Sequence, residues 1–397
     1  KISNKADYNQ KVAKTTMYNE SILDKMANIF DAGVIKDYAP QAPLPSVENM
    51  LPSGAVSAPT ADSPENSQIN TNVQTQGIDE ADVSKCDGQY IYCVFDNNFT
   101  IYNLQGNKIV DESLAINYSE MYVVEDKVIL LADTRTSIYS FDGNDVDLLK
   151  TFTYGQYNTS RVYQNQLLLI VNEQVDVNDE DTYENLYYDG CSQVNRVYSI
   201  YKYDLKRESF DVVKNLNSGQ TKLYTSTNNI YLATTVRKQN IVEDEYYSSM
   251  TQQQLTVISI FDYSLNALGA IRVQGSILNQ FSMDEYDNHL RVVTTNSFAF
   301  EPGRLNALSV YDLDDLSLVG YLDKDIGIDY QTVRSVRFEN ETCYVVTYQN
   351  SDPLYEIDIS DVTEPKIVSV YKSPGYSNYL HTFEIDGETY LFGIGYL

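Results

Sequence analysis

The chain of 397 residues has no tryptophan, two histidines and four cysteines. The cysteines are Cys86, Cys93, Cys191 and Cys343. So few cysteines exclude a disulfide-dense scaffold, and without a CxxC pair or a Cys/His cluster the sequence offers no zinc site. We expect the four thiols to be reduced, because strand pairing around Asp87 and Gly88 would not place Cys86 opposite Cys93.

Long apolar runs and positive charge are also scarce. No stretch of about 18 apolar residues is present, so the sequence predicts no transmembrane segment. The 28 Lys and Arg residues face 56 Asp and Glu, a net charge of −28. Such a surface repels phosphates, which argues against a nucleic-acid partner; it favours solubility, with attraction of Ca²⁺ or basic peptides as the alternative. No signal peptide is visible, and the chain begins at Lys1 rather than Met, as a mature or trimmed chain would.

Tyrosine, in contrast, occurs 35 times. Its ring packs while its hydroxyl reaches water, so tyrosine suits half-buried strand faces. Together with the abundant Asn, Asp, Ser and Thr, this composition indicates an all-β protein.

Three segments follow one another along the chain. Residues 1–38 are predicted to be helical, with apolar residues at helical spacing within 17–37. Residues 39–70 are rich in Pro, Ser and Ala and predict a linker. Residues 71–397 form the main domain.

The main domain contains a recurring unit. Each unit has a first strand, a polar turn, a strongly apolar second strand, a variable loop, a third strand of I-x-x-(F/Y)-D type and a short fourth strand. The second strands are expected at 90–95, 127–133, 166–172, 230–236, 290–296, 343–349 and 389–395. Their spacing of roughly 35 to 65 residues brackets the repeat length of propeller blades. Sheets packed face to face around an axis bury both partly apolar faces of each unit.

The sequence therefore predicts an all-β fold: a β-propeller of four-stranded blades, with six complete blades, a partial seventh and an N-terminal helix. Half a blade would leave an open edge. We expect further residues, or an N-terminal segment such as 70–84, to complete it. Long insertions at 173–195 and 237–253 follow the second strand in two blades, so we expect both on one rim.

Several blocks resemble a known family. Residues 71–92 (TNVQTQGIDEADVSKCDGQYIY) are similar to the opening signature of the secreted bacterial β-propeller-domain family distantly related to WD40 repeats. Residues 278–295, 336–381 and 392–395 (FGIG) resemble its later blocks, and 354–372 resembles an LVIVD-type repeat. The resemblance implies an extracytoplasmic protein, secreted or at the cell surface, and a chain that continues beyond the FGIG block. It supplies no catalytic residues.

An acidic cluster at 79–82 contains Asp79, Glu80 and Asp82. Its letters spell a helicase motif, but no phosphate-binding GxxxxGK[ST] loop accompanies it. We expect the cluster to begin the first blade and help close the ring, with cation binding as the alternative. No cofactor is expected, although Ca²⁺ is possible. An EF-hand in 176–185 is rejected, because Asp181 stands where the loop needs glycine.

Four basic or titratable residues fall in first strands, which line the channel of a propeller. They are Arg161, Lys222, Arg337 and His381. The arginines are expected to pair with buried carboxylates; the alternative is a channel site for an anionic ligand.

Tyrosines beside acids mark the two insertions. They are Tyr183, Tyr187, Tyr188, Tyr246 and Tyr247. Exposed aromatic rings stack on sugars or anchor protein partners. In a tyrosine-rich chain, however, their presence also needs no special explanation.

No GxSxG, HExxH or dinucleotide-binding motif is present, and 56 acids guarantee accidental carboxylate pairs. We therefore expect a non-catalytic extracytoplasmic binding or scaffold module that meets a protein or glycan partner at the cell envelope through its insertion rim. The helix would dock on the propeller or act as a spacer. A glycan- or peptide-directed hydrolase with acids at the channel mouth and a calcium-dependent adhesion module are the alternatives.

Overall fold

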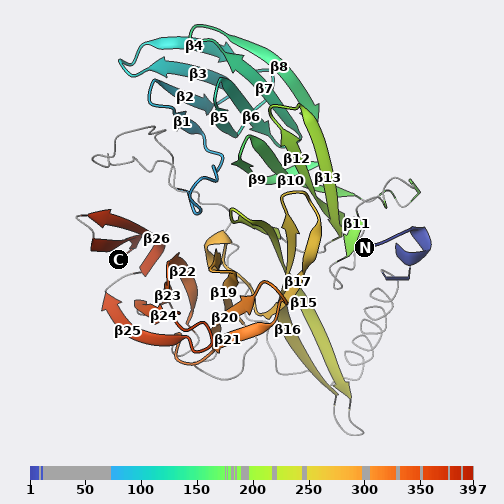
Figure 1. Cartoon of the computed structure of the whole chain (residues 1–397), viewed down its shortest axis with the longest axis vertical. Helices are drawn as coiled ribbons and strands as arrows, with labels where there is room; N and C mark the ends of the chain where they lie inside the picture. The colour runs from blue at the N-terminus through green and yellow to red at the C-terminus, as the bar shows by residue number, and fades with distance from the viewer. Residues whose placement is uncertain are drawn as a thin grey trace, which may run out of the picture.

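The computed structural model describes residues 1–8, 10–11, 73–174, 176, 178–179, 183, 186–188, 196–216, 221–243, 248–296, 305–327, 331–348, 352–373, 376–385 and 388–396. The predicted helix within 17–37 and the linker at 39–70 lie outside these residues. The described strands form seven sheets that follow one another around a common centre in chain order (Figure 1).

Six of these sheets contain the four antiparallel strands of a blade. Blade 1 contains β1 (Ser84–Cys86), β2 (Tyr90–Phe95), β3 (Asn98–Asn103) and β4 (Lys108–Ser113); blade 2 contains β5 (Glu120–Val124), β6 (Lys127–Ala132), β7 (Arg135–Phe141) and β8 (Val146–Thr153). Blade 3 contains β9 (Gln156–Tyr163), β10 (Gln166–Gln174), β12 (Arg196–Asp204) and β13 (Ser209–Leu216); blade 4 contains β14 (Thr221–Thr225), β15 (Asn229–Glu243), β16 (Ser248–Asp262) and β17 (Ala267–Gln274). Blade 5 contains the short 3-10 helix η2 (Gln280–Ser282), β18 (Met283–Tyr286), β19 (His289–Thr295), β20 (Asn306–Asp312) and β21 (Leu318–Leu322); blade 6 contains β22 (Thr332–Glu339), β23 (Thr342–Tyr348), β24 (Asp352–Asp358) and β25 (Lys366–Ser373).

The seventh sheet has two strands within the described residues, β26 (Tyr376–Ile385) and β27 (Glu388–Tyr396). The predicted propeller of six complete blades and a partial seventh is therefore confirmed. We expected further residues or an N-terminal segment to complete the seventh blade. Among the described residues, 73–83 do not pair with the seventh sheet, so this segment does not complete it.

The first two strands of several blades are joined by tight turns that the sequence specifies. Gln164 and Asn165 both have positive φ (48° and 62°), as do Asp287 and Asn288 (46° and 59°). A two-residue hairpin turn of type I′ needs positive φ at both central positions, and Asn and Asp adopt it at low cost. These turns fix the register of the strands that follow.

The core lies between successive blades. In β10, the side chains of Leu167, Leu169 and Val171 pack against blade 2, while Leu168 and Ile170 pack against blade 4. A continuous apolar run is typical of a strand that is buried on both faces, since successive side chains point to opposite sides. Packing of each sheet between two neighbours therefore explains the strongly apolar second strands.

The two long insertions take different forms. Residues of the first form β11 (Leu186–Tyr188), which pairs in parallel with β13 at the outer edge of blade 3. The second extends β15 and β16 to 15 residues each, and their hairpin projects away from the ring (Figure 1).

The N-terminal residues dock on blade 3. The amide of Ile2 donates to the carbonyl of Leu186 (2.8 Å), and Ile2 and Tyr8 are buried against Tyr183 and Val197. In the described part of the chain, no helix is both long and apolar enough to cross a membrane.

Candidate functional site

The segment before blade 1, residues 73–83, crosses the inner strands of several blades. The Gln74 side chain donates to the carbonyls of Gln280 (3.1 Å) and Met283 (3.0 Å) in blade 5. Thr75 donates to the carbonyl of Thr225 (2.9 Å) in blade 4. The segment thus begins against blades 4 and 5, whose residues come 150 to 209 positions later in the sequence.

The same segment then pairs with blades 3 and 2. Asp79 forms an isolated bridge with Val162 of β9, and Asp82 forms one with Met121 of β5. The chain enters β1 directly afterwards. Residues 73–83 therefore link blade 5 to blade 1 across the axis, which agrees with the structural role expected for this block.

The carboxylates of Asp79 and Glu80 in the acidic cluster are bound by other side chains of the protein. Asp79 forms an ion pair with Lys85 (2.7 Å), and burial raises the pKa of the Asp79 carboxyl although Lys85 opposes the shift. Both oxygens of Glu80 accept from the Gln280 side chain (3.1 Å each), and Arg161 lies 3.5 Å from one of them. Among the described residues, no cluster of three or more His, Cys, Asp or Glu could hold a metal ion.

The four predicted channel residues occupy the first strands of blades 3, 4, 6 and the partial seventh. They are Arg161 in β9, Lys222 in β14, Arg337 in β22 and His381 in β26. Arg161 pairs with Glu80, as expected for a buried arginine. Lys222 is half-buried and forms no ion pair with another described residue.

Arg337 and His381 lie on β22 and β26, two strands that pack against each other. The Nε atom of Arg337 and the Nδ1 atom of His381 are both buried, and neither has a hydrogen-bond partner. Burial and the nearby Arg337 charge lower the pKa of His381, while Glu339 opposes the shift. Of the predicted residues, these two each have a buried nitrogen without a hydrogen-bond partner.

The insertion tyrosines that the structure describes take part in packing. The ring of Tyr187 contacts Phe261 edge-on (5.9 Å between centroids) between blades 3 and 4. Tyr183 is 7% exposed and packs on Tyr8, so the expectation of an exposed ring is wrong there. The physical reason is that β11 folds back on blade 3 and the N-terminus covers it. The side chain of Tyr188 and residues Tyr246 and Tyr247 lie outside the described part, and their binding role stays a prediction.

The partial seventh blade presents an apolar face. Thr382 of β26 donates to Glu339 of blade 6, which identifies the face directed at that blade. Strand alternation and the pairing of His381 with Phe392 place Phe392 on the opposite face, together with Tyr390 and Ile394. All three are about half exposed, Phe392 at 51%.

Blade 1 has a corresponding open face. Tyr92 and Val94 of β2 pack toward blade 2, so Ile91 and Phe95 point the other way. Phe95 is 79% exposed. Because blade 1 and β26–β27 are the first and last sheets of the ring, these faces lie on the two sides of its opening (Figure 1).

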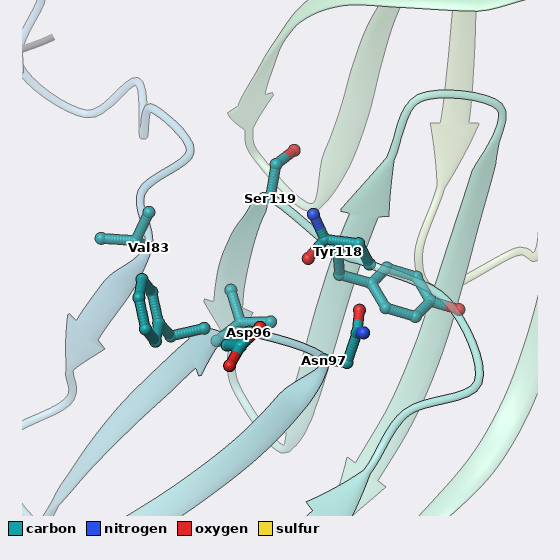
Figure 2. A pocket seen from close by; sticks show the side chains of 8 residues that line it. Val83, Asp96, Asn97, Tyr118 and Ser119 are labelled. Carbon is teal, nitrogen blue, oxygen red and sulfur yellow. The ribbon is translucent and has the colours of Figure 1, made fainter.

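A shallow pocket of about 380 Å³ lies beside blade 1. It is lined by Val83, Val94, Phe95, Asp96, Asn97, Asn117, Tyr118 and Ser119 (Figure 2). The Tyr118 hydroxyl hydrogen-bonds to Ser137 (2.7 Å) and therefore is not available to the pocket. With one carboxylate and no basic group in its lining, the pocket gives no pair of groups for acid–base chemistry.

Sequence reasoning missed several residues at the axis. Gln280 bridges Arg161 and Glu80, and Glu285 of β18 accepts from Asn228 (2.7 Å), Asn229 (3.1 Å) and other donors of blade 4. Single glutamine and glutamate residues within a strand-and-turn pattern carry no signal that distinguishes them, because their partners lie about 55 to 200 residues away.

Two curated relatives are archaeal proteins described as uncharacterized. One, from Methanocaldococcus jannaschii, is 25% identical over 414 residues and covers 82% of this chain and 64% of its own length. The other, from Archaeoglobus fulgidus, is 36% identical over 162 residues and covers 38% of this chain and 24% of its own length. This chain therefore spans less than two thirds of either relative. The bacterial source implied by the resemblance stays a prediction.

Among solved structures, Hsv2 of Kluyveromyces lactis is similar to this chain, with 10% identity and a TM-score of 0.41 over 75% of this chain and 88% of that chain. The model of the beta propeller domain family matches residues 69–397. This match includes every blade described above, and the chain belongs to that family.

Proposed function

We propose that this chain is an extracytoplasmic, non-catalytic binding or scaffold propeller, and that an extended segment with the pattern of a third blade strand, from the same protein or from a partner, pairs with β27. The extracytoplasmic location rests on the resemblance to a secreted family. The observation that carries the strand-pairing proposal is the half-exposed row Tyr390, Phe392 and Ile394 on β27, the outer strand of the seventh sheet within the described residues. In the complete blades, the corresponding second strand lies between two others.

The edge of β27 has none of the features that protect an edge strand. From Thr389 to Tyr396 it contains no charge and no proline, whereas β25, the outer strand of blade 6, carries Lys366 and Lys372. Charges and prolines keep natural edges from pairing with other chains. An unprotected edge of this kind favours strand addition, in which backbone hydrogen bonds supply affinity and alternate side chains supply specificity.

The complete blades indicate the chemistry of the partner segment. The third strands of blades 1 to 5 share a Ser or Thr, then Ile or Val, then an aromatic ring, at residues 100–102, 137–139, 199–201, 259–261 and 309–311. The small hydroxyl residue and the apolar residue alternate between the two faces of the sheet. A segment with this pattern fits β27 as the third strands fit their own neighbours.

The two alternative functions have less support. A hydrolase that works through acids at the channel mouth needs a pair of carboxyls in different protonation states. Asp79, the one described carboxyl with a raised pKa, is held by Lys85. Calcium-dependent adhesion through the acidic cluster would have to displace Lys85, Arg161 and Gln280.

A labelled peptide with the sequence of residues 305–323, the β20–β21 hairpin, tests strand addition. We expect fluorescence anisotropy to show saturable binding, and a scrambled peptide of the same composition to bind at least about tenfold more weakly. Replacing Phe392 and Ile394 with lysine should weaken binding by about tenfold or more, because each apolar side chain contributes on the order of 1 kcal/mol when its exposed half is buried.

A matched control is Tyr371→Lys on β25, another exposed aromatic on an outer strand of a complete blade. This variant should bind the peptide like the native chain. Equal binding of the scrambled peptide, or equal loss in the Tyr371→Lys variant, would overturn the proposal.

A further inference from the structure

Phe95 is the most exposed large apolar side chain among the described residues, at 79%. It ends β2, and a two-residue turn of Asp96 and Asn97 leads from it into β3 (Figure 2). Both turn residues have positive φ (49° and 61°), as a type I′ hairpin requires. The turn places Phe95 directly opposite Asn98, which is also exposed. Two residues that are opposite each other share one face of the sheet, with Cβ atoms about 4.5 to 5.5 Å apart. An exposed aromatic ring therefore lies beside an exposed asparagine amide.

Asn98 begins the sequence Asn-Phe-Thr at residues 98–100. Asn-x-Ser/Thr is the acceptor sequence for N-linked oligosaccharides in proteins outside the cytoplasm. Its central residue, Phe99, is fully buried between blades 1 and 2. Strand alternation therefore places Asn98 and Thr100 on the other face of the sheet, the face of Phe95.

The two functional groups of this acceptor sequence are available. The Asn98 amide makes one long contact, 3.4 Å to the carbonyl of Asp96. The Thr100 hydroxyl is half-buried and forms no hydrogen bond with another described residue. Neither group is therefore held by a strong internal partner, and the amide nitrogen that would receive a sugar is at the surface.

The other acceptor sequences of the described chain lack this arrangement. They begin at Asn117, Asn158 and Asn340. The hydroxyl of Ser160, in the sequence that begins at Asn158, is buried and bonds to Tyr122 (2.9 Å) and Tyr157 (2.7 Å). Asn117 and Asn340 lie outside the strands, so neither has an aromatic residue directly opposite it in a sheet. Asn98 alone of the four combines a free hydroxyl with an opposing exposed ring.

We propose that Asn98 carries an N-linked oligosaccharide whose first sugar stacks on the ring of Phe95. The C–H groups of a sugar ring form an apolar surface that suits an aromatic face, while its hydroxyls remain in water. Such a sugar covers a ring that the described part of the protein leaves exposed. This modification is separate from strand addition at β27.

The transfer forms one bond and breaks another. Nδ2 of Asn98 bonds to C1 of the first sugar, and the bond from C1 to a phosphate oxygen of a lipid-phosphate-linked oligosaccharide breaks. The Nδ2 proton leaves with the lipid phosphate, so nothing is oxidised or reduced. A transferase outside this chain catalyses the step beyond the cytoplasm. The inference therefore rests on the extracytoplasmic location in the proposed function.

Tryptic peptide mapping tests the modification, because cleavage after Lys and Arg separates the four acceptor sequences. Asn98 falls in fragment 86–108, Asn117 in 109–127, Asn158 in 151–161 and Asn340 in 338–366. In protein isolated from its source cells, we expect mass spectrometry to find a sugar mass on Asn98 in fragment 86–108.

Fractionation of the same cells distinguishes the two ways in which this test can fail. An unmodified fragment 86–108 in protein recovered from outside the cytoplasm would overturn this inference and leave the proposed function standing. Recovery of the chain from the cytoplasm alone would overturn both the proposed location and this inference. Peptide binding at β27 is measured separately and is decided by its own result.

Thermal unfolding of the glycosylated protein tests the stacking on Phe95. Asn98→Gln removes the sugar and should lower Tm by roughly 1 to 3 °C. In a Phe95→Ser background the same substitution should lower Tm by less than about half as much, since the ring is no longer present. Phe95→Ser leaves the core intact because Phe95 is 79% exposed. Equal losses of Tm in the two backgrounds would overturn the stacking.

Asn158→Gln is the matched control, because Asn158 is an exposed acceptor asparagine in a different blade. Its effect on Tm should be the same with and without Phe95. If Asn158→Gln depended on Phe95 as strongly as Asn98→Gln does, the coupling would not arise from contact between the sugar and the ring, and the stacking would again be overturned.

Discussion

A guanidinium nitrogen of Arg161 lies 3.5 Å from a carboxylate oxygen of Glu80, which joins the first strand of blade 3 to the segment that precedes blade 1. Both side chains also bond to Gln280, ahead of β18 in blade 5. Three distant parts of the chain thus meet in one hydrogen-bonded group at the axis.

Loss of the Arg161 side chain should destabilise the propeller. We expect Arg161→Met to lower the free energy of unfolding by about 2 to 4 kcal/mol, because Glu80 is left without its cation in a partly buried position. Urea unfolding measures the change. Lys206→Met is the control: its pair with Glu125 is exposed on both sides, so its effect should stay below about 1 kcal/mol. If the two variants lose a similar free energy of unfolding, the buried Arg161 contact stabilises the fold no more than an exposed ion pair does.

Calcium should leave thermal stability unchanged. Asp79 and Glu80 are already bound by Lys85, Arg161 and Gln280, so a cation gains no free ligands there. Thermal unfolding in millimolar CaCl₂, compared with MgCl₂ and with EDTA, measures the effect. A site filled at 100 times its Kd would add about 2.7 kcal/mol, and a calcium-specific rise in Tm would support the adhesion alternative instead.

Asp358 should make part of the stability of blade 6 depend on pH. Hydrogen bonds from Ser360, and then the pair with Lys366 (3.1 Å), lower the pKa of this carboxyl from 3.8 to about 2. A lowered native pKa stabilises the fold above the unfolded value, and this contribution is lost as the pH falls from about 4 to about 2. Asp358→Asn should therefore be less stable than the native chain near pH 6 and equal to it near pH 2. Urea unfolding at both pH values decides; a difference that persists near pH 2 would contradict the assignment.

Cys343 should be unreactive in the folded protein. It is fully buried between blades 5 and 6, and burial raises the pKa of its thiol. Because the thiolate is the reactive form, a thiol reagent should modify Cys343 only after unfolding. Peptide mapping after labelling in native buffer and in denaturant gives the measurement. Rapid native labelling of Cys343 would show that these blades separate readily.

The second strands were predictable because the apolar pattern that identifies each of them lies within a few consecutive residues. Residues 167–171 form an unbroken apolar run, which is what burial between two neighbouring sheets requires, and β10 is found there. A polar turn between the first and second strands of each unit was also expected, and the turn at Gln164 and Asn165 lies at that place. Blade number and strand order therefore followed from short segments.

The candidate sites were only partly predictable because their contacts are not local. First-strand placement of Arg337 and His381 followed from the repeat, but their lack of partners did not. Tyr183 was expected on an exposed rim, yet the N-terminal residues cover it. A contact of this kind cannot be predicted from the period of the sequence. The face of β27 likewise has the sequence of a buried strand, so its exposure is visible only in the assembled ring.

The path of residues 73–83 has a consequence for the order of folding. Gln74 bonds to residues 206 and 209 positions later, so its binding site does not exist until blade 5 has formed. This segment is synthesised before every blade, but it is placed after most of them. Contacts of such large sequence separation slow folding, since the loop must be closed before the contact is gained. The last step of folding is therefore expected to be the docking of a segment that precedes every described blade in the chain.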